Sequence, residues 1–150
     1  MYDLSGYREL AKHTSTPIAA GELHGEPGLV RLLMEAEGVD VVQPDLVFTG
    51  GVTGAWSLAR ESMDRGLRFS PHTWTNGLGL AANLHLAVAA ENCNWLEFPF
   101  DPPGWVPDGR DAMLTEPIVP GGDGLLRIPG RPGLGVELDE EKLAKYGTPL

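Results

Sequence analysis

Residues 39–66, VDVVQPDLVFTGGVTGAWSLARESMDRG, hold one complete strand, loop and helix. The short apolar run Val39 to Gln43 has the length and the β-branched composition of a buried strand. A loop with proline and glycine follows, and Thr53 to Arg65 then repeats apolar residues at helical spacing until Gly66 ends the helix. A strand followed by a crossover helix is the connection that joins parallel strands, so this stretch predicts an α/β fold.

The same unit recurs along the first hundred residues. Three further short apolar runs predict strands: 17–20 (PIAA), 67–70 (LRFS) and 95–98 (WLEF). Segments with apolar residues at helical spacing separate or precede the strands: 4–13, 29–37 and 78–90. Ser5 is the expected cap of the leading helix. The alternation predicts four parallel strands in one sheet.

Beyond Pro99 the sequence no longer alternates between predicted strands and helices. Its glycine and proline content predicts loops, with a hairpin-like piece at 121–135 (GGDGLLRIPGRPGLG) and a short charged helix at 140–145. We therefore expect residues 1–98 to form the βα units and residues 99–150 to form a loop-rich extension.

Composition excludes several classes of function. The 150 residues carry a net charge of −10, and the 11 lysines and arginines do not cluster, which argues against a nucleic-acid surface. No apolar run approaches the roughly 20 residues of a membrane helix, and the N-terminus lacks the features of a signal peptide, so we expect a cytoplasmic protein without membrane contact. Cys93 is the single cysteine, which excludes a disulfide framework and a cysteine zinc site within the chain.

Four ionisable residues occupy equivalent places in the four units. Glu22, Asp45 and His72 each follow a predicted strand, and Glu97 lies within the last one; successive members are separated by 23, 27 and 25 residues. The carboxyl ends of parallel strands lie along one edge, so we expect these side chains on one rim. Neighbouring strands are about 4.8 Å apart, so Asp45 could hydrogen-bond His72, fix its tautomer and make it a general base or acid.

Each of these residues also has a purely structural interpretation. Asp45 could form a turn beside Pro44, His72 could cap the following helix, and Glu22 could be a solvated carboxylate. Glu97 could pair with a neighbouring arginine. His13 and His24 carry no positional signal, and His85 has the setting of a packing residue. The stretch TGGVTG, residues 49–54, could hold a phosphate at a helix start, although it matches no nucleotide fingerprint.

Nearly the whole chain resembles the C-terminal part of mandelate racemase and muconate lactonizing enzyme family proteins, in the enolase superfamily. The order and spacing of several motifs carry the resemblance: PIAAGE (17–22), VDVVQPDLVFTGGVT (39–53), SPHTW (70–74), NLHLAVAA (83–90), WLEF (95–98) and DGLLRIPGRPGLGVELDEEKLAKY (123–146).

The resemblance implies the last four strands of a modified (β/α) barrel of the TIM type in residues 1–98. It also implies that the extension, residues 99–150, packs on the barrel and on the capping domain of the family. It implies that Glu22 is a carboxylate ligand of Mg²⁺ and that Asp45 and His72 form the base dyad. Glu97 would hydrogen-bond the carboxylate of the substrate as it becomes an enediolate. The superfamily uses a lysine or histidine base with Mg²⁺, which stabilises this dianion at neutral pH.

A whole family member also carries a lysine motif and two further metal carboxylates on earlier strands, and this sequence has neither. We therefore expect a truncated barrel with open sheet edges, which favours a homo-oligomer. The expected activity is Mg²⁺-dependent dehydration of a sugar acid by a carbon–oxygen lyase. The alternatives are a racemase or epimerase of a 2-hydroxy acid, a catalytically inactive fragment, and a nucleotide-binding module.

Overall fold

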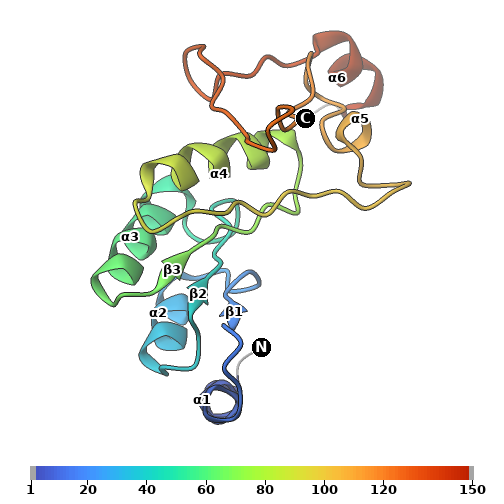
Figure 1. Cartoon of the computed structure of the whole chain (residues 1–150). Helices are drawn as coiled ribbons and strands as arrows, with labels where there is room; N and C mark the ends of the chain where they lie inside the picture. The colour runs from blue at the N-terminus through green and yellow to red at the C-terminus, as the bar shows by residue number, and fades with distance from the viewer. Residues whose placement is uncertain (1–2, 149–150) are drawn as a thin grey trace. The chain divides into compact units, whose positions relative to one another are not determined.

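Three short strands form the sheet in the computed structural model, which describes residues 3–148. They are β1 (Ala19–Ala20), β2 (Val41–Val42) and β3 (Arg68–Phe69), parallel and in the order β1-β2-β3 (Figure 1). Ala19 pairs with Val41, and Val41 pairs with Arg68. The parallel sheet predicted from the alternation of strands and helices is therefore confirmed for three of its four predicted strands.

Five of the six described helices lie where the sequence places them, and the short helix α5 falls in a segment predicted as loop. Their bounds are α1 (Leu4–His13), α2 (Pro27–Glu35), α3 (Gly51–Asp64), α4 (Gly77–Ala89), α5 (Pro107–Arg110) and α6 (Glu140–Tyr146). The cap of α1 is Asp3 and not Ser5, because the Asp3 carboxylate accepts the Gly6 N–H at 2.8 Å and the Ser5 hydroxyl at 2.7 Å. None of the described helices is both long and apolar enough to cross a bilayer.

The predicted strand at residues 95–98 is wrong, because this segment is extended without a strand ladder. Two separate bonds join β3 and the residue after it to residues 92–95: the Phe69 N–H donates to the Asn92 carbonyl, and the Ser70 hydroxyl donates to the Trp95 carbonyl. The Trp95 carbonyl thus accepts a side-chain hydroxyl, whereas in a strand ladder it would accept a backbone N–H of the neighbouring strand. The Trp95 side chain is 79% exposed, so the segment also lacks the two covered faces of a buried parallel strand.

The chain divides into two compact units, one with the residues up to His72 and Leu86–Glu97, the other with Thr73–His85 and the residues from Phe98. In the second unit the predicted hairpin at 121–135 is a set of turns without strands. A buried pair, Arg110 and Asp111, organises that unit: Arg110 donates to the Pro99 and Ile118 carbonyls, and Asp111 accepts the Ile118 N–H.

The core of the first unit lies between the sheet and the helices α2 and α3, which lie on the same side of it (Figure 1). Its most buried members are apolar: Val30, Leu33, Val42, Leu58 and Phe69. The glycines at 50 and 54 belong to this packing. A Cβ on Gly54 would lie 2.6 Å from the Thr49 carbonyl oxygen and 3.2 Å from Pro27, so the TGGVTG motif serves the close approach of α3 to the start of α2.

His24 is a buried polar residue of this unit to which the sequence analysis assigned no role. It is 2% exposed, and burial lowers the pKa of its imidazole below the usual 6.5 because the charged form loses its hydration.

We therefore expect stability to decline in mildly acidic solution. Between pH 6.5 and the lower pKa of folded His24, the unfolded chain binds more protons, so the free energy of unfolding falls as the pH falls through this window. Urea unfolding at several pH values between about 7.5 and 5 measures the decline. The His24→Gln variant, which cannot be protonated there, should show a shallower decline, and an identical decline in both proteins would contradict this account.

Candidate active site

The loops after the three strands bring Glu22, Asp45 and His72 together. His72 Nδ1 lies 3.1 Å from Asp45 Oδ2, and His72 Nε2 lies 3.6 Å from Glu22 Oε2. One imidazole therefore has a carboxylate at each nitrogen. All three residues belong to the same compact unit.

The register of the sheet explains why Asp45 meets His72. Pairing between β2 and β3 continues past the strands: the Ser70 N–H donates to the Val42 carbonyl and the His72 N–H donates to the Pro44 carbonyl. Val42 pairs with Phe69, so the strands are offset by 27 residues, which is also the separation of Asp45 and His72. The two side chains are therefore cross-strand neighbours, as the spacing predicts.

Asp45 is fully buried, and both of its carboxylate oxygens have partners. Oδ1 accepts the Val47 N–H at 2.9 Å and Oδ2 faces His72 Nδ1. The turn that the sequence allowed as an alternative is thus present together with the imidazole contact. A buried carboxylate at Nδ1 favours a proton on that nitrogen, so the Nε2 atom of a neutral His72 is the one able to accept a proton.

Glu22 is held at the rim by a tight turn. Gly21 has a φ of 132°, a value that side chains rarely permit, and a Cβ there would lie 3.1 Å from the Gln43 backbone nitrogen. The His24 N–H closes the turn on the Gly21 carbonyl at 3.2 Å. The Glu22 side chain is left 48% exposed, which makes it available to a ligand.

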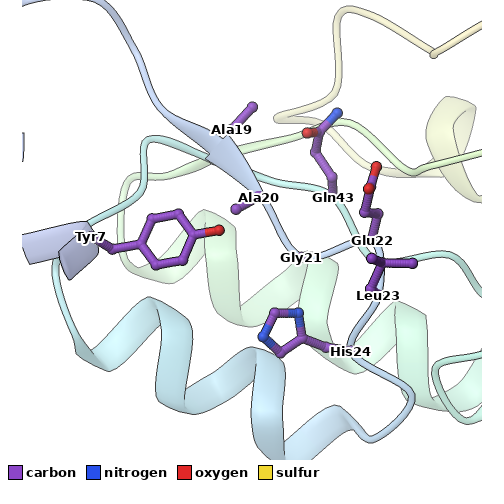
Figure 2. Close-up of a pocket in the computed structure, with 8 residues that line it drawn as sticks. All are labelled: Tyr7, Ala19, Ala20, Gly21, Glu22, Leu23, His24 and Gln43. Carbon is purple, nitrogen blue, oxygen red and sulfur yellow. The ribbon is translucent and has the colours of Figure 1, made fainter. Parts of the chain in front are cut away.

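A pocket of about 310 Å³ lies beside β1, next to this turn. Figure 2 shows Glu22 and Gln43 pointing to one side of the loop, while His24 and the Tyr7 ring lie on the other. Ala19, Ala20 and Tyr7 give the pocket an apolar wall, and neither Asp45 nor His72 is among the residues that line it. The pocket therefore lies on the open side of β1 and shares only Glu22 with the group formed by the imidazole and its two carboxylates.

Glu97, the fourth predicted residue, lies in the extended segment that the sequence predicted as a strand. Its side chain is half-buried, and its Oε2 atom is buried. The contacts of 3.1 and 3.6 Å described for His72 join it to Asp45 and Glu22. The role of Glu97 stays a prediction.

The fit to a divalent metal is incomplete. No group of three or more histidine, cysteine, aspartate or glutamate side chains suited to a metal ion occurs among residues 3–148. Glu22 offers one exposed carboxylate, the ligand type that Mg²⁺ prefers, and Mg²⁺ sites commonly take one or two protein carboxylates with substrate oxygens and water. Glu22 can therefore serve as one metal ligand, and the described residues do not complete a metal site by themselves.

The sequence did not connect two supporting residues with these three side chains. Thr49 and His24 are both buried, and the Thr49 hydroxyl donates to the His24 carbonyl at 2.9 Å. A threonine before a glycine pair is typical of a loop, and a histidine between Leu23 and Gly25 fits no spacing, so only the folded arrangement identifies them.

Curated relatives are similar in sequence to nearly the whole of this chain. The chain is 31% identical over 97% of its length to the D-galactarolactone cycloisomerase of Agrobacterium fabrum and 32% identical over 91% of its length to the D-galactonate dehydratase of Variovorax paradoxus. It spans 39% and 36% of these two proteins respectively.

Solved structures agree in fold. A member of the enolase superfamily from Polaromonas sp. JS666 matches 97% of this chain with a TM-score of 0.85 and 33% identity, and the match covers 38% of that protein. An enolase from Agrobacterium radiobacter, solved with Na and L-malate bound, matches 97% with a TM-score of 0.85 and 26% identity, over 39% of its own chain. These matches confirm the expected fold class, the C-terminal part of a modified (β/α) barrel.

The family model described as enolase C-terminal domain-like matches residues 1–142. The match includes all three βα units and the loops that carry Glu22, Asp45 and His72. By this match and by the sequence identity to its relatives, the chain belongs to the enolase C-terminal domain-like family.

Proposed function

We propose that this chain supplies the base of an enzyme that removes the proton alpha to the carboxylate of a sugar acid, and that the overall reaction is dehydration. The observation that carries the proposal is the His72 imidazole with Asp45 at Nδ1 and Glu22 near Nε2. The D-galactonate dehydratases and the D-galactarolactone cycloisomerase among the relatives favour an acid sugar as substrate.

In the proposed reaction, His72 Nε2 takes the proton from the alpha carbon of the substrate, and the C–H electron pair enters the carboxylate to give an enediolate. The imidazolium then returns that proton to the hydroxyl group on the beta carbon, which leaves as water. The remaining enol becomes a 2-keto-3-deoxy acid. No oxidant or further reactant is consumed, because substrate equals product plus water.

Asp45 and Glu22 have different roles in the proposed reaction. Asp45 holds the imidazole in one tautomer and stabilises its protonated form, because a buried carboxylate lies at Nδ1. Glu22 is the residue that would hold Mg²⁺, and the ion when bound supplies positive charge against the developing enediolate. The other ligands would come from substrate, water and residues outside those described.

Racemisation or epimerisation of a 2-hydroxy acid is the second candidate, because the same base can begin both reactions. The two reactions diverge after proton removal, since dehydration loses the beta hydroxyl whereas racemisation returns a proton to the opposite face. An inactive fragment is the third candidate, favoured by the absence of a metal cluster in residues 3–148.

The first test is product analysis with D-galactonate and Mg²⁺, followed by other sugar acids and simple 2-hydroxy acids. We expect a 2-keto-3-deoxy acid, which the His72→Asn variant does not form, because asparagine cannot accept the alpha proton. An inverted centre in an otherwise unchanged acid would favour the racemase. A folded wild-type protein that converts none of these acids would favour the inactive fragment.

The Asp45→Asn substitution tests the dyad. Asparagine keeps an acceptor for the Val47 N–H but can present an amide N–H to Nδ1, so we expect an intact fold and a fall in kcat of about 100-fold or more. Thermal unfolding and steady-state kinetics measure the two effects. Asp40→Asn is the matched control, since the Asp40 carboxylate accepts the Ile18 N–H before the start of β1, away from the dyad; equal kinetics in both variants would refute the dyad.

A further inference from the structure

The buried Thr49 side chain connects the loop after β1 to the loop after β2. Its hydroxyl donates to the His24 carbonyl at 2.9 Å, across 25 residues of sequence. Thr49 is completely buried and His24 is 2% exposed, so the bond is shielded from water. A hydrogen bond in such surroundings is stronger and more directional than one at the surface.

The two ends of this bond each lead to a residue of the candidate site. On one side, the His24 N–H closes the turn that presents Glu22. On the other side, the Thr49 N–H donates to the Asp45 carbonyl at 2.8 Å, in the turn that holds the Asp45 carboxylate. Thr49 thus connects the loops of Glu22 and Asp45. Its backbone N–H bonds the Asp45 turn, and its side-chain hydroxyl bonds the Glu22 loop.

The surrounding packing leaves Thr49 little freedom to move. Its carbonyl oxygen lies 2.6 Å from the place that a Cβ on Gly54 would take, so α3 approaches it as closely as glycine allows. Pro27, at the start of α2, approaches Gly50 and Gly54 on the same side. Loss of the hydroxyl would therefore remove the bond to the His24 carbonyl without opening space for a new arrangement of the loop.

We infer that Thr49 is a positioning residue that sets the distance of the Glu22 carboxylate from the His72 imidazole by fixing the Glu22 loop to the Asp45 turn. The catalytic part of this inference rests on the proposed function. Glu22 lies 3.6 Å from Nε2 and is half-exposed, so it depends on its loop for its place more than the buried Asp45 does. Partners that orient ligating carboxylates act in this indirect way.

The test compares Thr49→Val, which has nearly the same shape and no hydroxyl, with Thr49→Ser, which keeps the hydroxyl. In Thr49→Val we expect faster amide hydrogen exchange of residues 21–25 and a fall of about 10- to 100-fold in kcat for D-galactonate with a smaller change in KM. Thr49→Ser should restore both. In a Glu22→Gln background, Thr49→Val should lower kcat little further, because the group that it positions has already lost its charge.

Ser62→Ala is the matched control for the general loss of a buried hydroxyl. The Ser62 side chain is buried in the same unit and donates to the Ala59 carbonyl, away from the three site residues. This variant should lose stability while keeping the exchange rates of residues 21–25 and the kcat of the wild type. A kcat loss equal to that of Thr49→Val would reduce Thr49 to a contributor to stability and overturn the inference.

The failure of the inference and the failure of the proposed function give different results. Wild-type exchange rates at residues 21–25 in Thr49→Val would overturn the inference, whatever the activity. A wild-type protein that is inactive toward sugar acids, with a loop that loosens in Thr49→Val alone, would overturn the function and leave Thr49 as the residue that holds the loop. An active wild type with full kcat in Thr49→Val would overturn the catalytic role of Thr49.

Discussion

The pairing of β2 with β3 is the constraint on which the candidate site depends. A parallel ladder fixes which residues face each other, and a shift of one residue would turn every following side chain to the opposite face of the sheet. Here the ladder extends from Val41 opposite Arg68 to the bond between the His72 N–H and the Pro44 carbonyl. Asp45 therefore meets His72 for the same reason that the core residues Val42 and Phe69 meet.

Burial then gives the contact its chemical character. A carboxylate such as Asp45, with no exposure to solvent, needs strong hydrogen-bond partners, and the Val47 N–H and the His72 imidazole are two of them. The same arrangement that satisfies the carboxylate leaves Nε2 of His72 facing the half-exposed Glu22. Packing and chemistry are thus coupled: the residues that stabilise the loop ends are those that the proposed reaction uses.

Sequence reasoning reached the features that repeat and missed those that depend on packing. The 27-residue spacing of Asp45 and His72 predicted their contact because it equals the strand offset. The segment at Trp95 has strand-like composition, yet a side-chain bond from Ser70 replaces the ladder, which no periodicity reveals. The hydrogen bond from the Thr49 hydroxyl to the His24 carbonyl joins residues 25 apart in the sequence. Its acceptor is a backbone atom, which every residue has, so the identities of the two residues do not predict the bond.

The most direct test of the account is the release of deuterium from C2 of labelled D-galactonate into water. Both dehydration and racemisation begin by removing that atom, so the test does not depend on which product forms. With Mg²⁺ present, the account predicts release by the wild-type protein and none by the His72→Ala variant. Equal release by the two proteins, or no release by the folded wild type from D-galactonate or any other C2-labelled sugar acid, would contradict His72 as the base.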